Sequence, residues 1–155
     1  MSAQIEAYIK IGGPMNDDCR KTITESFGKS LGIAMNSRIE FALTSKEPML
    51  VEIEEVAFHI FEDLLFELNR VGMRFVAEFY RTSGVHGYVA WAKHGRIFWL
   101  YTNQEGPTVA TYDLEEIVKN NKLQELLHDI AFLKEKIHPL VAVHSAREYL
   151  AAESA

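Results

Sequence analysis

The chain has little cysteine, few positive charges and no long hydrophobic run. Its one cysteine, Cys19, excludes an internal disulfide and any zinc site that needs two cysteines. A reducing compartment fits this composition, so we expect the protein in the cytoplasm. No run of about 18 uncharged apolar residues occurs, and residues 1–10 lack the basic and apolar regions of a signal peptide. We therefore expect no membrane partner.

Acidic residues outnumber basic ones. There are 22 Asp and Glu against 16 Lys and Arg, for a formal net charge of −6. Binding to nucleic acid relies on Lys and Arg that neutralise phosphates, so this balance argues against a nucleic-acid partner. Bases could stack on the tyrosines of predicted strands, but basic residues on those faces alternate with glutamates, which makes a poor phosphate track. These tyrosines are Tyr8, Tyr80, Tyr88 and Tyr101.

Length and composition fit one globular domain spanning residues 1–155. Hydrophobic residues make up 48% of the sequence and charged residues 25%, which is ordinary for a globular protein. A chain of this length buries enough surface to form a core without a disulfide, a metal or a cofactor.

Residues 4–81 alternate between strand and helix periodicities. A period of two predicts strands at residues 4–11, 37–43, 49–53 and 74–81. In the second of these, Ile39, Phe41 and Leu43 point inward. A period near 3.6 predicts helices at residues 17–31, after an Asn16 or Asp17 cap, and 55–71. The order βαββαβ is that of a split βαβ unit, so we predict an α+β fold with a ferredoxin-like core.

Residues 86–102 predict an aromatic β-hairpin that extends this sheet. A two-residue loop at His94-Gly95 pairs Trp91 with Phe98 on one face and Ala90 with Trp99 on the other. That register also places Lys93 opposite Arg96, which is unfavourable. A bulge at Gly95 would shift the register and avoid the clash, so both arrangements remain open.

Residues 113–152 predict two C-terminal helices that cover one face of the hairpin. The first begins at Asp113, with Glu116 at capping-box spacing, and runs to about residue 137, with a hinge at Asn120 and Asn121 as one alternative. The second begins at Pro139 as its first helical residue.

Motifs for chemistry are weak throughout the sequence. His59, Glu62 and Asp63 share one helical face, but no second element supplies further metal ligands. Residues 12–18 join a strand to a helix without the glycine spacing of a phosphate loop. Ser83 and His86 lack the elbow motif of a nucleophile. We therefore predict no catalytic residue, no metal and no cofactor.

Aromatic side chains on incompletely covered surfaces are the strongest functional signal. The hairpin is apolar on both faces, and each long predicted helix carries a phenylalanine opposite its apolar stripe. Contacts within the chain could also cover these rings, so interface and internal packing remain open. The predicted interaction residues are Phe66, Tyr88, Trp91, Phe98, Trp99, Tyr101 and Phe132.

The sequence thus predicts a small acidic protein that acts through contact with a protein partner, as an inhibitor, immunity protein, adaptor or regulatory subunit does, or through a homodimer. The alternative is a small enzyme or ligand-binding domain with an aromatic and histidine pocket between the hairpin and the helices.

Overall fold

Strands and helices both build this α+β structure, a computed structural model that describes residues 4–81, 87–93, 95–103, 106–108, 111–134 and 140–142. The strands are β1 (Gln4–Met15), β2 (Met49–Ala57), β3 (Arg74–Arg81), β4 (Gly87–Lys93), β5 (Arg96–Asn103), β6 (Gly106–Thr108) and β7 (Leu140–Ala142). The helices are α1 (Asp17–Leu31), α2 (Asn36–Ser45), α3 (Phe58–Arg70), α4 (Thr111–Lys119) and α5 (Leu123–Lys134).

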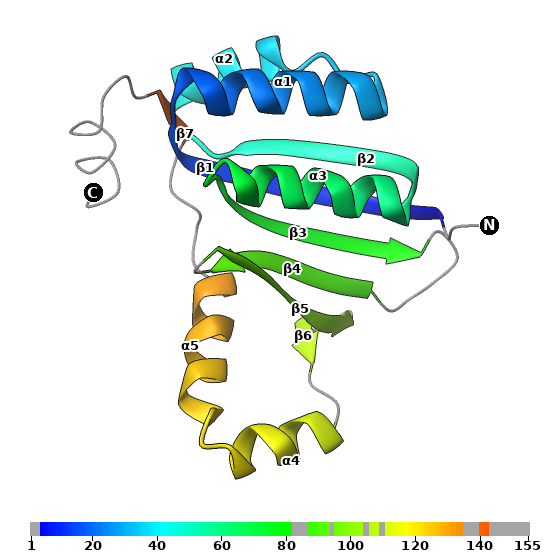
Figure 1. Cartoon of the computed structure of the whole chain (residues 1–155), viewed down its shortest axis with the longest axis vertical. Helices are drawn as coiled ribbons and strands as arrows, with labels where there is room; N and C mark the ends of the chain where they lie inside the picture. The colour runs from blue at the N-terminus through cyan, green and yellow to red at the C-terminus, as the bar shows by residue number, and fades with distance from the viewer. Residues whose placement is uncertain are drawn as a thin grey trace.

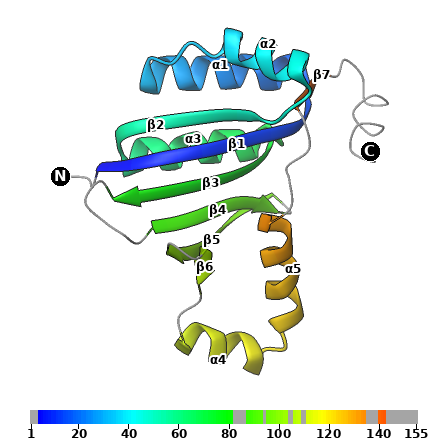
Figure 2. The same cartoon turned by 180° about the vertical axis from the view of Figure 1, so that it is seen from behind.

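The sheet has the strand order β2-β1-β3-β4-β5-β6, and neighbours in this order are antiparallel. α3 lies across one face of the sheet, and α1 contacts α3 (Figure 1). Seen from behind, β2, β1 and β3 carry no helix of the described ranges on their other face, which we call the open face (Figure 2). Side chains of β1 alternate accordingly, with Ile5, Ala7, Ile9 and Ile11 buried on the helix side.

Residues 37–43 are helical, so the predicted βαββαβ order is wrong although the α+β class is confirmed. They lie in α2, where Ile39 and Ala42 are buried three positions apart. The spacing of Ile39, Ala42 and Leu43 fits a helical face as well as the alternation of Ile39, Phe41 and Leu43 fits a strand. Helix formation turns Phe41 outward, where 71% of it is exposed.

A second correction concerns the two ends of the chain. β1 continues through residues 12–15 instead of ending before them, and these residues are buried. β7 pairs with them in parallel, although a helix was predicted from Pro139 onward. Pairing between segments so far apart in sequence leaves no local periodicity, and a three-residue strand is too short to show one. Pro139 and residues 143–152 lie outside the described residues.

The hairpin has the register of the two-residue loop. Trp91 pairs with Phe98, Ala90 with Trp99, and Lys93 with Arg96, so the unfavourable pair is retained. Gly95 takes a φ of 74°, which a glycine adopts at no steric cost. Asn69 of α3 donates a hydrogen bond to the Gly95 carbonyl at 2.9 Å, which attaches the hairpin turn to the end of α3.

Aromatic rings join α3 to the middle of the sheet. Phe79 of β3 packs against Phe58 and Phe61 of α3, with ring centroids 5.7 and 5.0 Å away. It also packs against Tyr88 of β4 at 5.2 Å and against Trp99 of β5, one strand further along the sheet, at 5.6 Å. Each ring that is fully buried in such a cluster stabilises the fold by about 1.5–3 kcal/mol. The helix-facing side of the hairpin is therefore part of the main core.

α4 and α5 form a separate arm at the end of the molecule opposite α1 and α2 (Figure 1). The predicted hinge is confirmed as a break between the two helices, with Asn121 at a φ of 58°. Large apolar side chains of the arm are exposed, namely Leu114, Val118, Leu123 and Leu127. Within the ranges that the structure describes, no helix has the length and apolar character needed to cross a membrane.

Candidate functional site: a groove beside the edge strand

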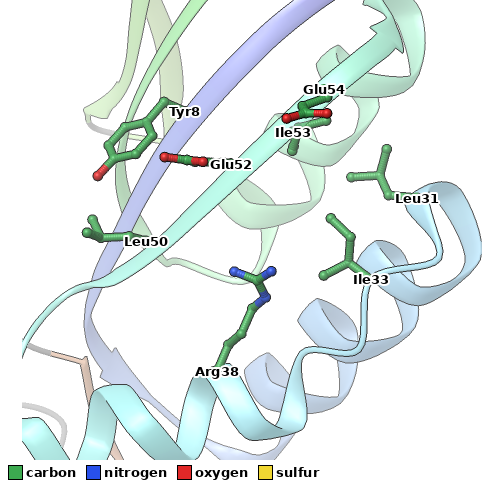
Figure 3. Close-up of a pocket in the computed structure, with 8 residues that line it drawn as sticks. All are labelled: Tyr8, Leu31, Ile33, Arg38, Leu50, Glu52, Ile53 and Glu54. Atoms are coloured by element: carbon green, nitrogen blue, oxygen red, sulfur yellow. The ribbon is translucent and has the colours of Figure 1, made fainter.

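A groove runs between strand β2 and the segment that leads from α1 into α2. A hollow of about 540 Å³ forms its main part, and Figure 3 shows the side chains around it. We call it the β2 groove. Its lining residues are Tyr8, Leu31, Ile33, Arg38, Leu50, Glu52, Ile53 and Glu54.

One wall of the β2 groove is an unpaired sheet edge. β2 is the terminal strand of the sheet, and among the described strands it pairs only with β1. Unpaired N–H and C=O groups along such an edge can accept a further strand. Side chains of β2 alternate, with Val51 and Ile53 buried while Leu50, Glu52 and Glu54 are exposed. The wall therefore offers backbone hydrogen bonds and, on the open face, two carboxylates.

A bulge shapes the far end of this edge. Ile5 pairs with Val56 and Ala7 with Ile53, so two β2 residues, Glu54 and Glu55, lie opposite a single β1 residue. Glu55 takes a φ of 44°, an uncommon conformation for a residue other than glycine. Bulges interrupt regular pairing along an edge, so the regular part of the β2 edge ends near Ile53.

The opposite wall comes from the turn after α1 and the first turn of α2. Gly32 has a φ of 67°, and the N–H of Ile33 donates to the Phe27 carbonyl at 3.2 Å, which is a glycine-based helix end. This turn places Leu31 and Ile33 beside the hollow, and the Arg38 side chain points into it (Figure 3). The wall is thus apolar with one cation.

Apolar surface continues from the β2 groove along α2. A second hollow of about 350 Å³ shares Arg38 and Leu50 with the first and is also lined by Phe41 and Pro48. Phe41 and Leu50 are both exposed. Sequence reasoning missed this surface, because a strand at residues 37–43 placed Phe41 in the core.

The charges in the β2 groove are not paired with one another. Among the described residues, neither Arg38 nor Glu52 nor Glu54 forms an ion pair or a hydrogen bond through its side chain. Arg20 of α1 by contrast forms an ion pair with Glu40 of α2, with 2.6 Å between the guanidinium nitrogen and the carboxylate oxygen. The groove therefore presents charged groups of both signs, on opposite walls, to any ligand that enters.

The open face next to the groove carries tyrosines between carboxylates. Tyr8 pairs with Glu52 on one side and with Glu78 on the other. Tyr80 donates a hydrogen bond to Glu78 at 3.4 Å. Burial raises the pKa of the Tyr80 phenol above its ordinary value, and the charge of Glu78 and this hydrogen bond add to the effect. Tyr80 therefore stays protonated, and its one donor hydrogen is used on Glu78.

The hairpin residues predicted to make contacts are largely packed within the chain. Tyr88 and Trp99 face the core, and Trp91 is 2% exposed and stacks on Phe98 at 5.9 Å. Phe98 is half-buried, so both faces of the hairpin are covered to a large degree. Contact of these residues with a partner stays a prediction.

The structure describes the side chain of only one of the two phenylalanines predicted opposite the apolar stripes of the helices. Phe66 is 51% exposed on α3, on the side away from the sheet. The side chains of Phe132 and of Tyr101 lie outside the described residues.

The weaker chemical motifs do not assemble into a site. Across the described ranges, no group of three or more His, Cys, Asp and Glu is placed to hold a metal ion. His59, Glu62 and Asp63 therefore do not form such a group. The Asn16 side chain caps α1 by accepting from the Cys19 N–H at 2.8 Å, so this donor is already used. Ser83 and His86 lie outside the described residues.

No family model, curated protein or solved structure matches this chain.

Proposed function

We propose that this protein acts by binding another protein, and that an extended segment of the partner adds to β2 inside the β2 groove. The observation that carries the proposal is the unpaired β2 edge beside a hollow of about 540 Å³. An extended peptide needs this combination, because the edge satisfies its backbone and the hollow receives its side chains.

Exposed apolar side chains along the groove support the proposal. Phe41 and Leu50 line the hollow that continues the groove, and both are exposed. Exposed aromatic and aliphatic groups beside a polar rim are typical of protein contact sites. Each anchor that a partner covers stabilises the complex by the free energy of removing it from water.

The proposed function is still contact with a protein partner, as expected from the sequence, but the contact surface is a different one. Inhibitors, adaptors and regulatory subunits in the cytoplasm all act through such contacts, and the proposal covers each of them. The contact surface moves from the hairpin aromatics to the edge strand and α2.

Selection from a displayed library of random linear peptides tests this function. The purified protein is the bait, and a Phe41→Ser, Leu50→Ser double variant is the comparison. We expect peptides that bind the wild-type protein and lose at least about tenfold in affinity on the double variant, as loss of interface anchors does. Fluorescence anisotropy with labelled peptides measures the affinities.

A Leu123→Ser, Leu127→Ser double variant on α5 is the matched control, because it removes two exposed leucines far from the groove. Its affinity should equal that of the wild-type protein, and thermal melting should show that both variants fold. Selected peptides that bind the groove variant normally, or that lose affinity only on the α5 variant, would overturn the proposal.

A further inference from the structure

We infer that the segment occupying the β2 groove carries Lys or Arg at alternate positions on one side and apolar residues on the other. This inference rests on the function proposed above and adds the chemical class of the partner. It follows from how the charges of the two walls are arranged.

Two glutamates define the basic side of the ligand. Glu52 and Glu54 are two positions apart on β2, and their carboxylates are exposed and unpaired among the described residues. An added strand that pairs along the regular edge places one residue opposite Glu52 on the open face, and its next residue on that face lies beside Glu54, where the bulge begins. Opposite charges at such cross-strand positions attract, whereas like charges repel. A segment with basic residues at positions i and i+2 therefore matches this edge.

The apolar wall and Arg38 define the other side of the ligand. Alternate side chains of an added strand point the opposite way, towards Leu31 and Ile33. Arg38 points into the hollow from this wall and is its only cation among the lining residues (Figure 3). It repels a basic side chain on that side, so the two walls together decide which face of the segment is basic.

A second copy of this chain is a poor occupant of the same groove. Antiparallel pairing of two β2 strands, centred on Glu52 or on Ile53, places glutamates of the two copies directly opposite each other. Each copy also has a net charge of −6, which adds long-range repulsion. The edge thus resists self-association, as charged edge strands generally do, while it remains open to a basic strand.

Peptides that share one apolar framework test the inference. A sequence selected on the wild-type protein is made with Lys, Thr or Glu at the alternate positions, and each version is titrated by fluorescence anisotropy. Two cross-strand charge pairs should make the Lys version bind about two- to thirtyfold tighter than the Thr version. The Glu version should bind weakest, and the differences should shrink between about 0.02 M and about 0.5 M salt.

A Glu52→Lys, Glu54→Lys variant should reverse this order, so that the Glu version binds best. The matched control is Glu115→Lys, Glu116→Lys on α4, which makes the same change in net charge on exposed residues at the far end of the molecule (Figure 1). It should keep the order Lys, Thr, Glu.

The possible outcomes distinguish failure of this inference from failure of the proposed function. Equal affinities of the three versions, still sensitive to Phe41→Ser with Leu50→Ser, overturn the inference and leave the proposed function standing. The same order on the Glu52, Glu54 variant as on the wild-type protein also overturns it, because general attraction to an acidic protein would then explain the preference. If the selection yields no peptide whose binding depends on the groove, both the inference and the proposed function are overturned.

Discussion

α3 and the α4–α5 arm have similar sequence patterns but lie in different environments in the structure. Each was predicted as an amphipathic helical segment with an apolar stripe and a phenylalanine opposite to it. In the structure α3 buries Phe61, Leu64, Leu65 and Leu68 in the core that it forms with the sheet and α1. The arm leaves four large apolar side chains exposed, Leu127 among them.

The difference teaches that an apolar stripe predicts a helix but not what covers it. α3 follows β2 directly and precedes β3, so short connections hold it against these two strands, and it also contacts β5. α4 and α5 follow the last strand of the sheet path and are free to extend beyond it (Figure 2). Exposed leucines on the arm are therefore weaker evidence for a partner than exposed groups beside an unpaired strand edge, where backbone groups also need partners.

The largest expected loss of stability that tests this difference between α3 and the arm is in α3. Leu65 is 0% exposed, so Leu65→Ala leaves a cavity in the core and should lower the free energy of unfolding by about 2–5 kcal/mol. Urea denaturation monitored by circular dichroism measures the change.

Leu127→Ala is the matched substitution on α5. Half of the Leu127 side chain is exposed, so the free energy of unfolding should change by no more than about 0.5 kcal/mol. Losses of similar size for the two leucines would break the comparison, because they would mean that the arm is as deeply packed as α3.

The smallest effect concerns the polar side of α3. Arg70 donates hydrogen bonds to Glu67, the shortest at 2.7 Å, and these hold the pKa of the Glu67 carboxyl below its ordinary value of 4.5. The positive charge of Arg70 lowers the pKa further, while burial opposes both. Because the folded-state pKa is the lower one, the pair stabilises the fold above the unfolded-state pKa, and this contribution is lost as pH falls through the folded-state value.

Arg70→Gln should therefore raise the Glu67 pKa towards 4.5 and weaken the dependence of stability on acid pH. NMR titration of the Glu67 side chain gives the pKa directly. The stability change itself should be small, because both partners of the pair are exposed. An unchanged Glu67 midpoint in the variant would show that Arg70 is not the cause of the shift.

Local sequence patterns predicted the hairpin, α1 and α3, because the hydrogen bonds that form each of these elements join residues that are close in sequence. The pairing of Trp91 with Phe98 is one of the two registers that the sequence left open for this hairpin. β7 depends on contact with a segment more than a hundred residues earlier, which leaves no periodic signal.

The groove was missed for a related reason. Ile39, Phe41 and Leu43 alternate as in a strand, and only packing decides that Ile39 and Ala42 are buried together on a helix. Once Phe41 is placed inside the core, neither an exposed apolar surface on α2 nor a hollow beside β2 can be inferred. Arg38, Leu50 and Glu52 were visible in the sequence, but nothing in their spacing indicated that they line one site.

Amide hydrogen exchange with and without a selected peptide tests the central claim most directly. Binding in the β2 groove should slow exchange of the β2 amides along the unpaired edge and leave α4 and α5 unchanged. Slower exchange confined to α5 or to α3 around Phe66, with β2 unaffected, would contradict the account and place the contact on a helix face instead.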